Sequence, residues 1–201
     1  IAPDGTVWAS KLNGNRVVKI DPDRAKWEAV KAEYDKHMEA GDREKAQEAW
    51  AAVVTEYVPP FIGPRRLHVS PVDGMVGVPG FAGGEIGRFD PKTEEWKIFH
   101  MPDAENDIPY ALNIHPQTNE IWVCGTGSDT IMRLVPDAGE NGEWVTYRMP
   151  TRVTYTREIE FHPDGSVWAC NSNYPPRHIE NGRGSVIRIE VDSSQALPTT
   201  D

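Results

Sequence analysis

The stretch IAPDGTVWAS at residues 1–10 returns as FHPDGSVWAC at residues 161–170, and this repetition decides the fold class. Two weaker copies lie between them, HVSPVDGMVGV at 68–78 and IHPQTNEIWVC at 114–124. Four copies of one phrase indicate an internal repeat. A period of roughly 40 to 50 residues is typical of the blades of a β-propeller.

Each repeat contains further shared phrases in which apolar and polar residues alternate. The second phrase is RVVKIDP at 16–22, EIGRFDP at 85–91, TIMRLVP at 130–136 and SVIRIEV at 185–191, and a third is EEWKIFHMP at 94–102 and GEWVTYRMP at 142–150. Alternation with a period of two, bounded by Gly, Pro and Asp, predicts short β-strands. Repeats of about four strands predict an all-β fold of the β-propeller type.

Residues 23–57 interrupt this pattern with a period of 3.6 residues, which indicates helix. One apolar stripe holds Trp27, Val30, Tyr34 and Met38, and a second holds Ala46, Ala49, Trp50, Val53 and Tyr57. Gly41 suits the C-terminal cap of a first helix, and Asp42 suits the N-terminal cap of a second. The segment therefore predicts an inserted αα-hairpin, most simply an appendage for packing or docking.

The repeats divide the chain into six parts. These are a partial blade with its second and third strands at 1–22, the helical hairpin at 23–57, the outer strand of the first unit and the second blade at 58–102, the third blade at 103–150, a last blade lacking its outer strand at 151–191, and a polar tail at 192–201. About three and a half blades are thus present. We expect the remaining blades of the ring to come from outside this segment or from another chain.

Composition excludes several classes of function. The net charge is −10 and the basic residues form no cluster longer than Arg65-Arg66, so we expect no nucleic-acid partner. The chain has no apolar run of the roughly 20 residues that a membrane-spanning helix needs. Its two cysteines, Cys124 and Cys170, form no CxxC, CxxCH or zinc-binding pattern, so we expect no metal site and no cofactor within this segment. Both are predicted to be small core side chains.

The phrases PDGTVWAS and PDGSVWAC, with the continuation GxIxRFDPxTxEWxxYxxP, resemble the repeats of the virginiamycin B lyase (streptogramin lyase) family. The resemblance implies a ring of seven blades and a periplasmic or secreted location. It also implies an enzyme that opens a cyclic depsipeptide by elimination, with a His base and a carboxylate-bound magnesium near the central axis. Domains with the same repeat occur on extracytoplasmic redox proteins, so a redox partner protein is a further expectation.

In that family the His side chains commonly follow a Pro at the entry to the inner strand. The matching positions here are Pro64-Arg65, Pro109-Tyr110 and Thr156-Arg157, and none is His. A guanidinium group cannot accept a proton, so Arg65 and Arg157 do not supply a general base. Together with Glu158 they predict a ring at one mouth of the channel that suits a carboxylate, a phosphate, or an aromatic acid stacked on Tyr110. The alternative is that each Arg pairs with a carboxylate of a neighbouring blade.

A second candidate for ligand binding is the loop NSNYPPRHIENGRG at 171–184, which is longer than its counterparts. It carries Asn171, Asn173 and His178, and loops on a rigid scaffold are where recognition residues concentrate. His68, His115 and His162 precede Ser-Pro or Pro at positions that repeat from blade to blade. Repetition favours a role in turn structure for these three residues.

Two functions follow as hypotheses. The first is an extracytoplasmic binding or scaffold module that recognises a partner protein or a small anionic ligand at the channel mouth. The alternative is a lyase of the streptogramin type that opens a cyclic ester by elimination, with magnesium and with catalytic residues partly outside this segment.

Overall fold

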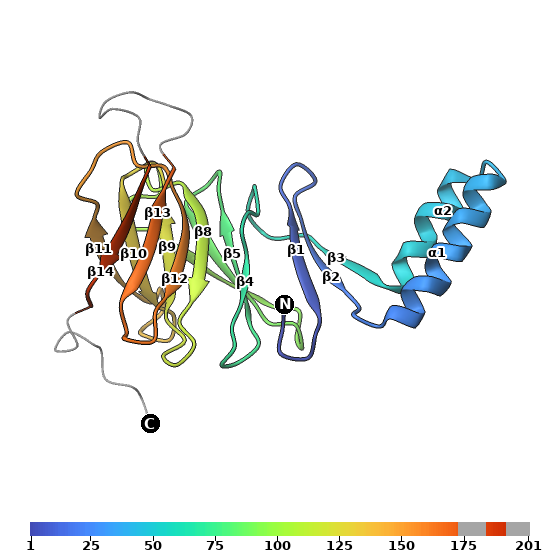
Figure 1. The fold of residues 1–201 in the computed structure, drawn as a ribbon, viewed down its shortest axis with the longest axis horizontal. Coiled ribbons are helices and arrows are strands. Elements are labelled where there is room, and N and C mark those ends of the chain that lie inside the picture. Colours follow the sequence, from blue (N-terminus) through green and yellow to red (C-terminus); the bar gives the residue numbers. More distant parts are fainter. Residues whose placement is uncertain (173–183, 192–201) are drawn as a thin grey trace.

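The computed structural model describes residues 1–172 and 184–191 as four antiparallel sheets that follow one another in chain order (Figure 1). The sheets contain three, four, four and three strands, and hydrogen-bonded neighbours in each sheet are consecutive in the sequence. This is the meandering topology of propeller blades. The predicted all-β propeller fold is confirmed.

The first sheet consists of β1 (Val7–Lys11), β2 (Arg16–Ile20) and β3 (Val54–Tyr57). The strand β3 lies inside the range 23–57 that the sequence assigned to the helical hairpin, so the outer strand of this unit begins earlier than residue 58. The spacing of Val53 and Tyr57 suits a helix, but the β-branched run from Val53 to Thr55 favours an extended backbone, which pairs Val54 with Ile20.

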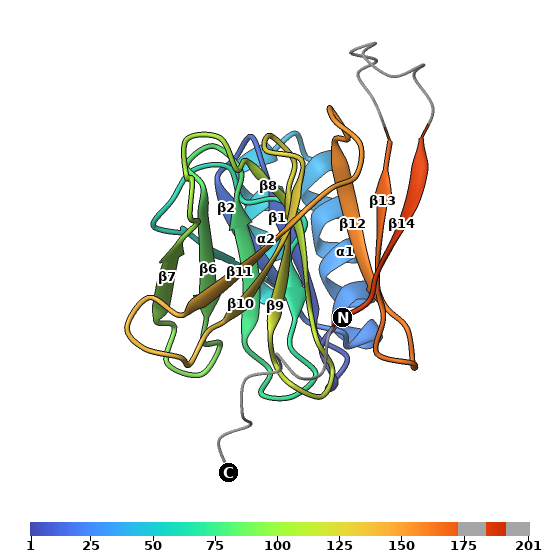
Figure 2. The ribbon, with the colours of Figure 1, turned by 90° about the vertical axis from the view of Figure 1, so that its left-hand side faces the viewer.

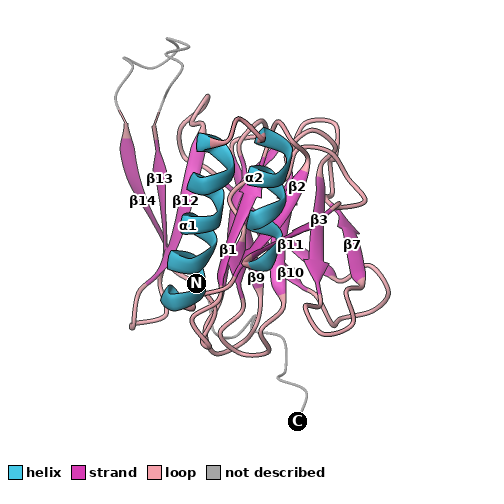
Figure 3. Cartoon of the chain, turned by 90° about the vertical axis from the view of Figure 1, so that its right-hand side faces the viewer, coloured by secondary structure: helices cyan, strands magenta, loops and turns pink. Residues whose placement is uncertain are grey.

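Between β2 and β3 lie α1 (Arg24–Glu39), α2 (Arg43–Ala49) and the short 3-10 helix η1 (Trp50–Ala52). The Asp23 carboxylate accepts hydrogen bonds from the first backbone N–H groups of α1, and Asp42 does the same for α2. The indole of Trp50 packs on Trp27 and Tyr34, with ring centroids 5.1 and 5.5 Å apart. Figures 1 and 3 show the two helices side by side, beyond the first sheet and away from the other three.

The remaining sheets follow the repeats closely. The second contains β4 (His68–Val69), β5 (Val76–Gly80), β6 (Glu85–Phe89) and β7 (Trp96–His100); the third contains β8 (Pro109–Ile114), β9 (Ile121–Gly125), β10 (Thr130–Val135) and β11 (Glu143–Arg148); the fourth contains β12 (Thr156–Phe161), β13 (Val167–Asn171) and β14 (Ser185–Ile189). Figure 2 shows the fourth sheet, with β12, β13 and β14 side by side.

The apolar core lies between consecutive sheets. Trp122 on β9 is only 1% exposed because it packs against Ile159 and Val167 of the fourth sheet. Trp168 is the equivalent residue of the fourth sheet, but it is only half-buried, and Cys170 is exposed. The prediction of a core position is therefore correct for Cys124 and wrong for Cys170, because no sheet of the described chain covers that face of β13.

Close packing of the second sheet against Phe61, in the segment between β3 and β4, predicts a strong effect of Gly87→Ala. The Gly87 position is buried, and a Cβ there would overlap the Phe61 ring and lie 2.9 Å from Cε3 of Trp96. Overpacking of this kind costs about 1–3 kcal/mol. We expect the free energy of unfolding, measured by urea denaturation, to fall by that amount. Gly14→Ala is the control, because its Cβ would meet nothing closer than 3.6 Å; equal stability of both variants would contradict the packing.

Candidate functional site

The first strands of the second, third and fourth sheets lie next to one another and bring the predicted site residues to one end. Residues 66 and 111 form a parallel bridge between the second and third sheets, and Asn113 on β8 donates a hydrogen bond of 2.8 Å to the carbonyl oxygen of Ile159 on β12. Strands that run in the same direction place their starting residues at the same end. Tyr110 and Arg157 are the second residues of β8 and β12, and Arg65 lies three residues before β4.

Tyr110 is the centre of this group. Its side chain is buried, and the guanidinium carbon Cζ of Arg65 lies 3.9 Å from its ring centroid, while that of Arg157 lies 5.3 Å away. The rings of Phe81 and Tyr155 pack edge-on against Tyr110 with centroids 5.9 and 5.8 Å away. The structure therefore brings the three predicted residues together, in what we call the Tyr110 cluster: Arg65, Arg66, Phe81, Tyr110, Tyr155, Arg157 and Glu158.

Arg65 is fixed in place by aromatic rings. Its guanidinium lies 4.4 Å from the Phe81 centroid as well as 3.9 Å from that of Tyr110, and its backbone N–H donates to the carbonyl oxygen of Pro79. Cation–π contacts hold a guanidinium through its face and leave the N–H donors at its edge unused. Within the described ranges, no carboxylate forms an ion pair with Arg65 and its guanidinium donates no hydrogen bond.

Arg66 differs from Arg65 because it already has a carboxylate partner. Its Nη1 lies 2.8 Å from Oε2 of Glu158 and also donates to the carbonyl oxygen of Arg157, 3.1 Å away. The contact joins the second sheet to the fourth, and the residue bridged to Arg66 on the intervening strand is the small Ala111. The alternative that each Arg pairs with a neighbouring carboxylate is thus true of Arg66 and not of Arg65.

A strained loop presents Tyr155 to the cluster. Val153 and Tyr155 have φ angles of 56° and 49°, a left-handed conformation that is costly for a β-branched residue. The Asp129 carboxylate holds the loop by accepting hydrogen bonds from the backbone N–H groups of Val153 and Thr154, at 2.7 and 2.6 Å. The Tyr155 ring then lies 4.7 Å from the Arg157 guanidinium.

Sequence analysis missed three members of the cluster: Arg66, Phe81 and Tyr155. The phrase in which Phe81 lies, GFAGG, has no aromatic counterpart at the matching point of the next repeat, so repetition could not reveal it. The available signal was proximity in the sequence: Arg66 follows Arg65, and Tyr155 lies two residues before Arg157.

The second predicted ligand site is described only in part. Asn171 lies at the end of β13, where its buried side chain donates to Oγ of Ser185 and links β13 to β14. This hydrogen bond gives Asn171 a structural role. Asn173 and His178 lie outside the described residues.

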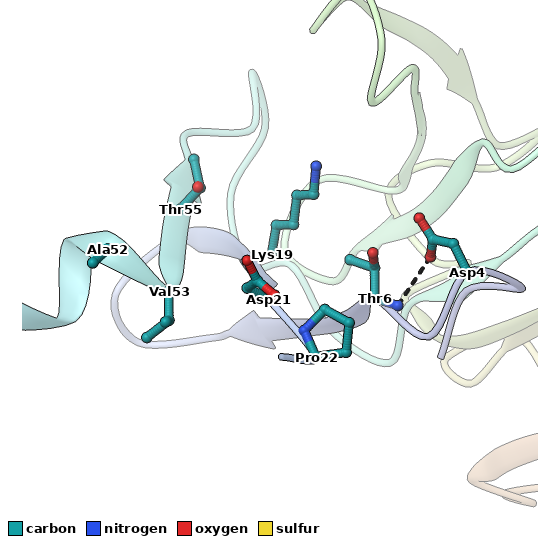
Figure 4. Close-up of a pocket in the computed structure, with 8 residues that line it drawn as sticks. All are labelled: Asp4, Thr6, Lys19, Asp21, Pro22, Ala52, Val53 and Thr55. Atoms are coloured by element: carbon teal, nitrogen blue, oxygen red, sulfur yellow. Dashed lines mark hydrogen bonds between the residues drawn. The ribbon is translucent and has the colours of Figure 1, made fainter. Parts of the chain in front are cut away.

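Two cavities that share Asp4, Thr6 and Lys19 lie at the first sheet, and none of their lining residues belongs to the Tyr110 cluster. The larger, of about 390 Å³, is lined from β2, η1 and β3 (Figure 4). Its carboxylates already have partners in the chain, because Asp4 accepts from the Thr6 backbone N–H and Asp21 pairs with Lys26 at 2.6 Å. These contacts leave the Tyr110 cluster as the more promising site.

Neither a candidate metal site nor a candidate membrane-spanning helix occurs among the described residues. There, no three His, Cys, Asp or Glu side chains gather closely enough to hold a metal ion, so this part of the chain does not fit the magnesium site that the lyase resemblance implies. Among the same residues, no helix has the length and apolar character to cross a membrane.

Comparison with known proteins places the fold. No family model matches the sequence, and no curated protein matches it significantly. Among solved structures, a catalytically inactive virginiamycin B lyase from Staphylococcus aureus with quinupristin matches with a TM-score of 0.63 and 20% identity, over 96% of this chain and 54% of the lyase. Hydrazine synthase from Kuenenia stuttgartiensis matches with a TM-score of 0.65 and 18% identity, over 94% of this chain and 44% of its own.

The chain has the β-propeller fold. A third match is the dihydro-heme d1 dehydrogenase NirN, with a TM-score of 0.58 and 16% identity, over 100% of this chain and 35% of the dehydrogenase. The propeller chain spans about half the length of the lyase structures that it matches. At these identities the similarity shows the fold alone, and the three names denote three different activities.

The surroundings of His115 and His68 predict how the free energy of unfolding changes with pH. The Nδ1 atom of His115 accepts hydrogen bonds from the backbone N–H groups of Gln117 and Thr118, which requires an unprotonated nitrogen, and burial lowers the pKa of His115 below 6.5. The unfolded chain then binds more protons than the folded one once the pH falls below about 6.5, so stability is lost as the pH falls through the folded pKa. Burial lowers the pKa of His68 in the same direction.

We therefore expect the free energy of unfolding to decrease from pH 7 to pH 5. In the variant His115→Asn we expect it to decrease by a smaller amount over the same range. Asparagine keeps an acceptor for the turn without a titrating group. Urea denaturation at several pH values measures how the free energy of unfolding depends on pH in both proteins. We expect the titration of His68 to contribute to the pH dependence that the variant keeps. Identical slopes in the two proteins would show that His115 does not titrate as described.

Proposed function

We propose that this propeller segment is a binding module that recognises a small anionic ligand through the Tyr110 cluster. The proposal rests on the surroundings of Arg65. Its guanidinium packs on the faces of Phe81 and Tyr110 and forms no ion pair with a carboxylate of the described chain. Planar guanidinium forks match carboxylate and phosphate oxygens in pairs, and such bonds are stronger than those between neutral groups.

Two physical features support recognition by this cluster. The aromatic contacts fix Arg65 before any ligand arrives, so less side-chain entropy is lost on binding. The chain as a whole carries a net charge of −10, whereas the cluster gathers Arg65, Arg66 and Arg157 around one ring. An anion is therefore drawn to this point and repelled by most of the remaining surface.

The structure favours binding at guanidinium edges over stacking on Tyr110. The Tyr110 ring is only 7% exposed and is surrounded by Arg65, Phe81 and Tyr155, so little of its face is open to an aromatic acid. The chemical class that fits is a ligand with a carboxylate or phosphate group.

The lyase alternative has weaker support. It rests on fold similarity, and that similarity extends to proteins named for other activities. The positions that match the family's Pro-His pairs hold Arg65, Tyr110 and Arg157. A location outside the cytoplasm and a redox partner protein rest on the same resemblance and stay predictions.

Binding of inorganic phosphate, measured by isothermal titration calorimetry at low ionic strength, tests the proposal. We expect Arg65→Ala to weaken binding by about tenfold or more, the scale of one charge-assisted hydrogen bond, and Arg65→Lys to weaken it less. Arg43→Ala is the matched control, because Arg43 is exposed on α2, in the helical pair that lies beyond the first sheet (Figure 1). No binding by the unaltered protein, or equal binding by Arg65→Ala, would refute the proposal.

A further inference from the structure

Exposed apolar side chains lie beside the Tyr110 cluster. Ile62 is in the segment between β3 and β4, three residues before Arg65, and is 70% exposed. Leu12 is in the turn between β1 and β2 and is 38% exposed. Single exposed apolar residues are ordinary on a protein surface, whereas several together can form part of a binding site. Their position relative to Arg65 therefore bears on the kind of ligand that the cluster takes.

The backbone of Gly63 brings these apolar residues together. Its N–H donates to Oδ1 of Asn15 at 2.9 Å, which ties the segment to the turn between β1 and β2. Gly63 has a φ of 78°, and a Cβ built there would lie 3.5 Å from Cδ1 of Leu12 and 3.6 Å from Cβ of Phe81. Leu12 and Phe81 thus lie beside the same glycine, and Ile62 precedes it. We call Leu12, Ile62 and Phe81 the apolar rim.

Phe81 belongs both to the apolar rim and to the Tyr110 cluster. Its backbone N–H donates to the carbonyl oxygen of Gly63 at 2.9 Å, and its ring centroid lies 4.4 Å from the guanidinium carbon of Arg65. The side chain of Phe81 is half-buried, so part of it faces solvent next to that guanidinium. A ligand held at the edge of the Arg65 guanidinium therefore lies next to an apolar surface.

We propose that the ligand of the Tyr110 cluster is a carboxylate joined to a short aliphatic chain, with the carboxylate on Arg65 and the chain on the apolar rim. This inference rests on the proposed function. Arg65 forms no ion pair with a carboxylate of the described chain, so its planar fork can pair with the two oxygens of one ligand carboxylate. The charge of the ligand and its apolar part then each have a counterpart in the protein.

The aliphatic chain matters because ion pairs in contact with solvent are weak. Water and salt screen the charges, so Arg65 by itself orients a small carboxylate but binds it loosely. Each methylene group of the ligand that leaves water raises the affinity by about fourfold. Burial of about two methylene groups on the apolar rim would therefore raise the affinity by roughly tenfold or more.

Titration calorimetry with sodium acetate, sodium hexanoate and hexylammonium chloride, at pH 8 and one fixed low ionic strength, tests this preference. Both carboxylates are ionised at that pH, and hexylammonium carries an aliphatic chain on a positive group. We expect hexanoate to bind at least about tenfold more tightly than acetate, and hexylammonium not to bind. Equal affinities for the two carboxylates, or equal affinities for hexanoate and hexylammonium, would overturn the inference. Binding of inorganic phosphate would then leave the proposed function in place, and no binding of any anion would refute both.

The variant Ile62→Ser tests the apolar rim. It removes an exposed apolar side chain, so we expect the ratio of hexanoate to acetate affinity to fall by about fourfold or more, whereas Arg65→Ala weakens the binding of both anions. Val72→Ser is the matched control, because Val72 is 51% exposed but follows β4, whereas Ile62 and Arg65 precede it. An unchanged ratio in Ile62→Ser, or the same fall in Val72→Ser, would show that the rim does not contact the chain of the ligand.

A second copy of the protein is the other occupant that this variant detects. Analytical ultracentrifugation of the unaltered protein and of Ile62→Ser measures self-association. A monomer in both, together with the expected affinity ratio, supports a ligand on the apolar rim. If hexanoate gains nothing from its chain and the unaltered protein is a dimer that Ile62→Ser dissociates, the rim is a contact between copies and the inference is overturned.

Discussion

The covering of one sheet's apolar face by the next sheet is the constraint on which this structure depends. Trp122 is 1% exposed where the fourth sheet covers it, and Trp8 packs in the same way on Phe89 of the second sheet, with centroids 5.9 Å apart. A sheet that is apolar on one face has to bury that face against another element. Consecutive blades therefore stabilise one another. Polar contacts at their edges fix the register, such as those of Arg88 with Asp73 in its own sheet and with Asp137 of the next.

The candidate site is a consequence of that stacking. Equivalent positions of successive repeats become neighbours at the inner edge, so residues far apart in the chain, such as Arg66 and Glu158, form an ion pair. A cluster built in this way needs only one suitable residue from each repeat. The blades supply rigidity, and the loop held by Asp129 adds Tyr155 at the cost of two residues with positive φ.

The sequence predicted the repeating features well and the unique ones poorly. Alternation revealed the strands of the second and third sheets, and the meeting of Arg65, Tyr110 and Arg157 followed from their equivalent places. The start of β3 was missed because Val53 and Tyr57 suit a helix as well as a strand. The half-buried Trp168 and exposed Cys170 were missed because burial depends on a neighbouring sheet, which composition does not encode. Arg66 was missed as a site residue because its partner lies two sheets away.

The way in which Arg65 is held explains why this cluster suits binding better than proton transfer. Aromatic faces immobilise a guanidinium without neutralising it, whereas a carboxylate would hold it equally well and remove its charge. A lysine would lose the planar contact with both rings, and with it the fixed direction of its donors. The propeller thus holds a charged guanidinium at a fixed place between two aromatic rings, which is the feature that the proposed anion binding requires. Because a guanidinium group cannot accept a proton, a general base for any chemistry has to come from residues other than Arg65 and Arg157.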